Sequence, residues 1–359
     1  MTHAPSHLPR DFAISITLLT AFACLYPFSG WRTTGVGPFD YLSAPWPRYF
    51  TWTDIWLNVL GFIPIGFAWA TWARQKFRPG RTLLGVWLAG TLLSFAVETT
   101  QNYLPTRVAS NIDLATNSIG SLIGAACGLR WGRIFEPGGI LPRWRERLFL
   151  PGRSGSSAIL LITLWWFSLL NPSSYLFANG DLHAVFRSVP VIQLGGGNFL
   201  HIETLLTAAN TLVIGLFAQH AMRRPRLWLP LVILLLGLSV KTLATTAFLA
   251  PPQPWHWATP GGLFGLAAGV GLLVLCWMLP MALRLSIASL ALLAATALVN
   301  LAPDNPYWEA GTKLAREGHV LNFHGATEVM AGFWPFLALL WLSLARPAPP
   351  SRPAVEIID

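Results

Sequence analysis

The sequence predicts an all-α fold, a polytopic transmembrane helical bundle, and three observations lead to this expectation. Of the 359 residues, 53% are hydrophobic and only 11% are charged. The mean hydropathy is +0.52. Long uncharged runs recur along the chain, as in segments that cross a bilayer. The formal charge of +9 does not indicate a nucleic-acid partner, because the basic residues lie in short loops between apolar runs, where they orient helices.

A spanning helix needs about 20 mostly apolar residues, and on that scale the chain contains about ten candidates. The first follows Arg10 and has no small-residue cleavage pattern after it, so we expect an uncleaved helix. The expected spans are Phe12–Phe28, Asp54–Ala73, Thr82–Gln101, Ile112–Trp131, Ser157–Leu170, Phe199–Gln219, Leu227–Leu249, Pro260–Leu279, Leu283–Leu301 and Phe323–Ala345.

The basic residues predict the orientation of these spans. Most of the 24 Lys and Arg residues fall on one side of the expected membrane, which the positive-inside rule makes cytoplasmic. We therefore expect a multi-pass protein of the cell membrane with both termini in the cytoplasm. The residues on this side are Arg10, Arg74, Lys76, Arg78, Arg81, Arg130, Arg133, Arg143, Arg145, Arg147, Arg153, Arg223, Arg224, Arg226, Arg284, Arg346 and Arg352.

Comparison of the chain with itself indicates a duplicated four-helix unit. LSFAVETTQNYLPT at Leu93 is similar to LSVKTLATTAFLAPP at Leu238, and the expected helix order repeats; convergence among apolar helices is the alternative. The predicted organisation is a first unit (1–150), a degenerate second unit (151–282), two C-terminal helices (283–346) and a disordered cytoplasmic tail (347–359). The alignment pairs Glu98 with Lys241, Asp113 with His256 and Asn117 with Pro260.

Polar residues gather where three expected helices end on the outer side. Residues three or four apart share a helical face, which pairs Asp54 with Asn58, Glu98 with Gln101, and Asp113 with Asn117. The connection between the third and fourth spans adds Arg107, which can pair with a carboxylate or a phosphate. The candidate ligand-binding residues are Asp54, Asn58, Glu98, Gln101, Arg107, Asp113 and Asn117.

Each of these residues also has a purely structural interpretation. Asp54 and Asp113 can cap helix N-termini, and Asn58 and Asn117 can join helices by hydrogen bonds. Arg107 can be a charge at the rim. Glu98 fits a structural role least well, because it precedes a helix C-terminus, where the helix dipole disfavours an anion.

The outer side also carries histidines and glutamates, and Lys241 lies within an expected span. Asn198, His201 and Glu203 precede one helix, and Asn322, His324 and Glu328 begin another. Without HExxH or CxxC spacing we expect no metal site and no cofactor. Lys241 predicts a counter-charge, for which Glu203 and Glu328 are the candidates. The three cysteines lie in apolar runs and are read as packing residues.

Two motifs in this region resemble the VanZ-like family of bacterial integral membrane proteins. They are DxxxNVxxFxPxG at Asp54–Gly66 and ExxQxxxPxRxxSxxDxxxNxxG at Glu98–Gly120. The resemblance covers roughly residues 50–130 and implies an integral protein of the cell envelope. The family's founding member is associated with resistance to the glycopeptide teicoplanin. No reaction is generally agreed for the family, so the resemblance implies positions and no catalytic residue.

These observations leave several functions open. The first is binding of an amphiphilic or lipid-linked envelope molecule, which is glycopeptide-related by family analogy. Membrane lipids are the other expected partners. The second is an enzyme acting on a lipid or cell-wall precursor with Glu98 and Asp113 as acid and base, although no nucleophile motif supports it. The third is a transporter, and the fourth is a structural protein whose polar groups only fix helix packing.

Overall fold

The structure is a computed structural model that describes residues 8–26, 28, 30–33, 35, 37–46, 52–104, 107–135, 139–183, 199–249, 253–303, 305 and 320–344. Helices dominate this part of the chain, which contains no β-strand, and Phe149 and Met222 form an isolated β-bridge. The expected all-α class is therefore confirmed. The chain divides into two compact units, Met1–Arg145 with Arg316–Ala326 and Glu146–Ala315 with Thr327–Asp359.

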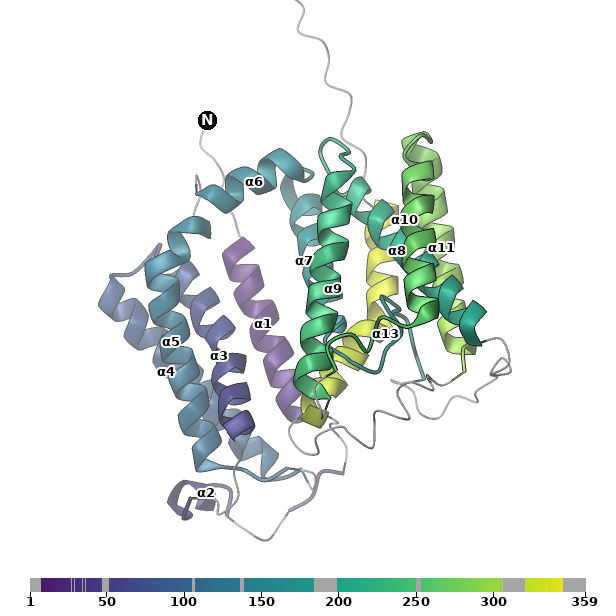
Figure 1. The fold of residues 1–359 in the computed structure, drawn as a ribbon. Coiled ribbons are helices and arrows are strands. Elements are labelled where there is room, and N and C mark those ends of the chain that lie inside the picture. Colours follow the sequence, from purple (N-terminus) through teal and green to yellow (C-terminus); the bar gives the residue numbers. More distant parts are fainter. Residues whose placement is uncertain are drawn as a thin grey trace, which may run out of the picture. The chain divides into compact units, whose positions relative to one another are not determined.

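The first unit is built on four long helices that lie side by side (Figure 1). Helices α3 and α5 make its most extensive contact, and α4 packs against α5. The elements of this unit are α1 (Leu8–Leu25), α2 (Asp40–Ser43), α3 (Trp52–Ala73), α4 (Pro79–Gln101), α5 (Asn111–Trp131) and η1 (Gly132–Phe135).

A row of glycines explains why α3 and α5 approach so closely. Gly120, Gly124 and Gly128 lie four residues apart on α5, so they share one face. A Cβ at each of them would collide with a backbone carbonyl of α3, those of Val59, Ile63 and Phe67 respectively. Small residues at such positions let helix backbones meet in a membrane environment.

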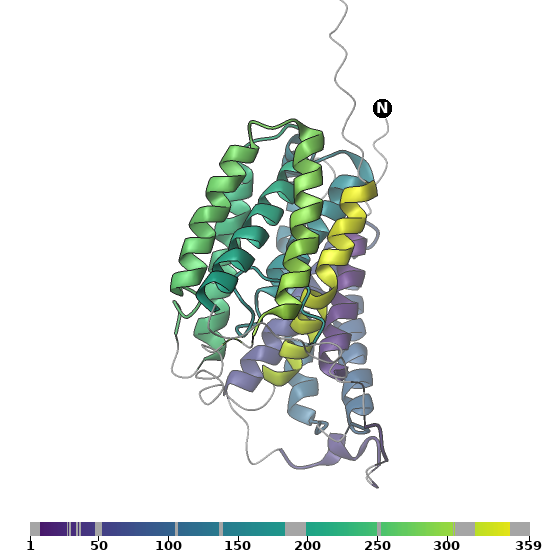
Figure 2. The ribbon, with the colours of Figure 1, turned by 90° about the vertical axis from the view of Figure 1, so that its right-hand side faces the viewer.

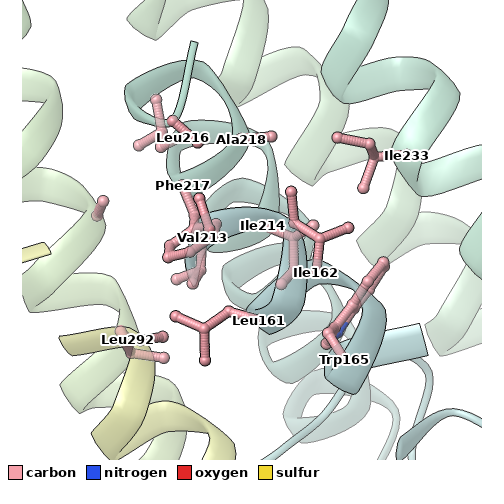
Figure 3. Close-up of a cluster of buried hydrophobic side chains, with 14 of the residues drawn as sticks. Leu161, Ile162, Trp165, Val213, Ile214, Leu216, Phe217, Ala218, Ile233 and Leu292 are labelled. Atoms are coloured by element: carbon pink, nitrogen blue, oxygen red, sulfur yellow. The ribbon is translucent and has the colours of Figure 1, made fainter. Parts of the chain in front are cut away.

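The second unit has its own hydrophobic core, shown in part in Figure 3. Trp165 and Phe217 are fully buried at its centre, and Trp334 donates from Nε1 to the Leu161 carbonyl at 2.8 Å. Figure 2 shows the helices of this unit from the side. The remaining helices are α6 (Ile140–Leu148), in which the first unit ends, α7 (Gly152–Ser168), α8 (Phe199–His220), α9 (Trp228–Phe248), α10 (Pro260–Cys276), α11 (Met281–Leu301) and α13 (Val320–Leu344).

All ten expected helices are present, but fewer of them have the length and composition of a span. Seven are long and apolar enough to cross a membrane, namely α3, α4, α5, α8, α9, α11 and α13. Helices α7 and α10 are each 17 residues long, and α10 ends at Cys276 rather than at Leu279. Ten spans therefore stay a prediction, as do the duplication and the four-part division of the chain. The predicted disordered tail lies outside the described residues.

Candidate polar site in the first unit

The predicted site residues lie at one end of the first unit, because of where they fall along their helices. Glu98 and Gln101 are in the last turn of α4, whereas Asp113 is in the first turn of α5. Asn58 lies in the second turn of α3. Arg107 is half-buried in the connection between α4 and α5.

Two hydrogen bonds between side chains tie the helices together here. Asn58 donates from Nδ2 to Asp113 Oδ1 at 2.7 Å, which joins α3 to α5. Asn117 donates from Nδ2 to Ser94 Oγ at 3.0 Å, which joins α5 to α4. The two asparagines therefore do act as interhelical links. The buried Oδ1 of Asn117 has no hydrogen-bond partner within the described residues.

The start of α5 is capped by Ser110, a residue that our prediction passed over. Ser110 Oγ accepts from the Asp113 backbone N–H at 3.4 Å, so Asp113 is the third residue of the helix and not its cap. The capping alternative for Asp113 is therefore wrong. A Ser followed three residues later by an acidic residue is a sequence signal of a helix N-terminus, and it was available in SNID at Ser110–Asp113.

Glu98 supplies the acceptor that completes this N-terminus. Its Oε2 accepts from the Ser110 backbone N–H at 3.0 Å, and the side chain is only 3% exposed. In a regular capping box the third helical residue would take that amide; here a carboxylate from α4 takes it. The negative charge of Glu98 thus lies at the positive end of the α5 dipole, which favours it.

Gln101 and Arg107 both bind backbone carbonyls at the end of α1. Gln101 Nε2 donates to the Cys24 carbonyl at 2.8 Å, and an Arg107 terminal nitrogen donates to the Tyr26 carbonyl at 2.7 Å. The C-terminal carbonyls of a helix have no partners within the helix, so side chains often supply the donors. These partners could not be predicted from residue types, because every residue has a backbone carbonyl.

Three charged groups lie within electrostatic range of one another in this cluster. Glu98 is repelled by Asp113 and attracted by Arg107. Arg107 forms no ion pair with a carboxylate of the described residues, and its buried Nε has no acceptor there. Burial lowers the pKa of the Arg107 guanidinium, whereas Cys24 and Glu98 raise it. The guanidinium is thus partly dehydrated and retains an unused donor.

Short segments next to α1 and α2 fold over the same end. Tyr41 Oη and Thr99 Oγ1 lie 3.3 Å apart, and Asn111 Nδ2 donates to the Ala44 carbonyl at 2.8 Å. The Arg32 backbone N–H donates to the Tyr103 carbonyl at 3.0 Å. The residues before α3 therefore form part of the surroundings of the site, a contribution that the motifs did not indicate.

Some predicted residues lie outside what the structure describes. Asp54 belongs to α3, but its side chain is not described, and neither are the side chains of Asn322 and His324. Asn198 also lies outside the described residues. Among the described residues, no group of three or more His, Cys, Asp or Glu side chains is arranged to hold a metal ion.

The fold defines a helical membrane protein, and its first unit carries a cluster of polar side chains at the ends of three helices. In the comparison with known families, residues 10–132 match the sequence model of the family described as VanZ/LLP1. The resemblance seen in the two motifs is therefore confirmed over this segment, which contains all seven candidate site residues. No curated protein and no solved structure matches the chain.

Proposed function

We propose that this VanZ-like membrane protein binds an amphiphilic or lipid-linked envelope molecule through the polar cluster of its first unit. The observation that carries the proposal is that the Arg107 side chain is half-buried and has an unused hydrogen-bond donor. Its guanidinium is half-buried and without a carboxylate among the described residues, and it keeps a buried donor, Nε, with no acceptor there. A planar guanidinium with spare donors suits a phosphate or carboxylate, which it can bind with two parallel hydrogen bonds.

The neighbouring residues have separate roles in this proposal. Gln101 and Glu98 hold the ends of α1 and α5 in place, through Cys24 and Ser110 respectively. Asn58 orients Asp113. Asn117 offers a buried acceptor, Oδ1, to a hydroxyl or amide of the ligand. Rigid positioning by such contacts lowers the cost of ordering the site when a ligand binds.

In the same proposal, the cluster lies on the outer face of the membrane. The basic residues that follow α3 and α5 lie at the opposite helix ends from Glu98 and Asp113, and the positive-inside rule assigns those ends to the cytoplasm. A ligand with its polar head at the outer surface and its chain in the outer leaflet would then reach Arg107. The bacterial cell envelope is the location that the family analogy favours.

The test is binding of a polyprenyl phosphate to the full chain in lipid nanodiscs made of phosphatidylcholine. The Arg107→Ala variant is expected to lose binding by about tenfold or more, since a charge-assisted hydrogen bond is worth roughly 1.5–3 kcal/mol. Arg32→Ala is the matched control, because Arg32 is an exposed arginine whose backbone lies beside the same connection. Equal binding by Arg107→Ala and wild-type protein of equal thermal stability would overturn the proposal.

One observation supports a second candidate, an enzyme with a pair of carboxylates. Glu98 is buried and is repelled by the half-buried Asp113, and carboxylates in unlike surroundings can divide acid and base roles. Turnover of a lipid-linked precursor by purified protein, lost in Glu98→Gln, would favour this candidate. Binding without turnover would favour the first.

A further inference from the structure

The short helix α6 differs from the membrane spans in its length and in its composition. It has nine residues, Ile140–Leu148, with the sequence ILPRWRERL. At about 1.5 Å of rise per residue, it reaches less than half of the ~30 Å hydrocarbon core of a bilayer. It is therefore too short to cross a membrane, yet none of its residues is buried within the described part of the chain.

The apolar side chains of α6 form one exposed stripe. Ile140, Trp144 and Leu148 follow each other at intervals of four residues, and Leu141 lies three residues before Trp144, so all four share a face. Ile140, Leu141 and Trp144 are 57%, 42% and 56% exposed. An apolar stripe with a tryptophan on a helix that does not span is typical of helices that lie in the membrane interface.

Arginines border this apolar stripe on both sides. Arg143 and Arg147, four residues apart, lie along one edge, and Arg145 lies along the other. Glu146 is the only acidic residue of α6 and lies on the opposite face. Arg143 and Arg147 are exposed. Arginine side chains beside an apolar face can extend along it and place their charges at the level of the lipid headgroups.

Two backbone hydrogen bonds join the end of α6 to the connection between α8 and α9. The Leu148 carbonyl accepts from the Arg223 N–H at 2.9 Å, and the Leu150 N–H donates to the Ala221 carbonyl at 2.9 Å. Both α8 and α9 are long and apolar enough to cross a membrane, so the connection between them belongs at a membrane surface. The end of α6 therefore belongs at the same surface.

The connection between α8 and α9 adds positive charge beside α6. Arg223, Arg224 and Arg226 are exposed, as is Arg153 in the first turn of α7. Within residues 139–153 and 221–228, Glu146 is the only acidic residue. Such an excess of arginine at a membrane surface is complementary to anionic lipids, and each basic residue there strengthens the attraction by about fivefold.

We propose that α6 lies in the headgroup region of the membrane and, with the connection between α8 and α9, binds anionic phospholipids such as phosphatidylglycerol. The apolar stripe inserts toward the acyl chains, and the arginines contact lipid phosphates. The positive-inside rule assigns this surface to the cytoplasm. The proposal does not depend on the polar cluster of the first unit, which lies at the start of α5 and shares no residue with this surface.

The test is fluorescence quenching of the full chain in nanodiscs of phosphatidylcholine. Cys24, Cys127 and Cys276 are replaced by alanine, and one fluorophore is attached at Leu141→Cys in the apolar stripe or at Glu146→Cys on the opposite face. Added lipids with a doxyl group on the acyl chain quench a fluorophore that reaches the acyl region. We expect doxyl phosphatidylcholine to quench the label at position 141 and to leave the label at position 146 largely unquenched.

The same label reports the preference for anionic lipid. At equal mole fraction, doxyl phosphatidylglycerol is expected to quench the label at position 141 about fivefold more efficiently than doxyl phosphatidylcholine. Salt at 1 M should remove this excess, because it shortens the screening length to about 3 Å.

A double variant, Arg143→Gln with Arg147→Gln, separates charge from insertion. It is expected to lose the excess quenching by phosphatidylglycerol and to keep the quenching by phosphatidylcholine. The matched control is Arg78→Gln with Arg81→Gln, which removes two exposed arginines near the start of α4 and should keep the excess. Thermal unfolding verifies that the variants are folded, and Ile140→Cys replaces Leu141→Cys where the latter is not.

Three results would overturn the proposal. Equal quenching at positions 141 and 146 would mean that the apolar stripe does not face the membrane. Equal quenching by the two lipids before the arginines are changed would exclude a preference for anionic lipid. Equal loss of the excess in both double variants would assign the preference to the total charge of the chain. Failure of the first-unit site would look different, because its ligand is tested in nanodiscs without phosphatidylglycerol.

Discussion

Glu98 Oε2 lies 3.0 Å from the Ser110 backbone nitrogen, so a carboxylate near the end of α4 serves the N-terminus of α5. This contact accounts for an anion at a helix C-terminus, where the dipole of its own helix disfavours it. The dipole of the next helix compensates. The acidic end of α4 and the capped start of α5 are therefore one structural unit.

The first prediction concerns the two parts of the Glu98 side chain, its oxygen acceptor and its charge. Glu98→Gln keeps an acceptor for Ser110, so its thermal unfolding in detergent is expected to stay within a few degrees of wild type. Glu98→Ala leaves the Ser110 amide unsatisfied and is expected to cost about 1–3 kcal/mol. A Glu98→Gln protein that unfolds as readily as Glu98→Ala would show that the charge itself holds the fold.

The second prediction concerns the link between α3 and α5. Asn58→Ala and Asp113→Ala are expected to be non-additive in unfolding free energy, with a coupling of about 0.6 kcal/mol and at most about 1.7 kcal/mol. A double-mutant cycle in detergent measures this coupling. Additive effects would mean that the 2.7 Å contact contributes nothing to stability.

The third prediction concerns the glycine row on α5. Gly124→Ala places a Cβ against the Ile63 carbonyl, and overpacking of this kind typically costs about 1–3 kcal/mol. Gly85→Ala on α4 is the matched control, because a Cβ there meets nothing within 4 Å. We expect Gly85→Ala to be neutral or stabilising, since alanine has the higher helix propensity. Equal unfolding temperatures for the two variants would contradict the close packing of α3 and α5.

The sequence predicted the helices well, because a chain that crosses a bilayer needs long apolar helices joined by polar connections. It also placed Asn58 and Asp113 at helix ends on one side, since residues four apart share a face. It could not show that Gln101 and Arg107 would bind carbonyls of α1. Those acceptors belong to the backbone, so only the folded arrangement reveals them.

Lys241 shows the same limit in the second unit. A buried lysine usually indicates a carboxylate partner, and the sequence offered Glu203 and Glu328. The structure instead surrounds the ammonium with Asn171 and Ser174, in the turn that follows α7. Charge pairing can be expected from residue types. Hydrogen bonds from the ammonium to the carbonyls of a turn depend on backbone conformation, which the sequence pattern did not specify.

In the proposed function, Arg107 receives an anionic group of a lipid-linked molecule. Native mass spectrometry of the lipids that co-purify with wild type, Arg107→Ala and Arg32→Ala tests it most directly. We expect an anionic amphiphile that is retained by wild type and Arg32→Ala and is lost from a folded Arg107→Ala protein. The same anionic amphiphile on all three proteins would contradict it.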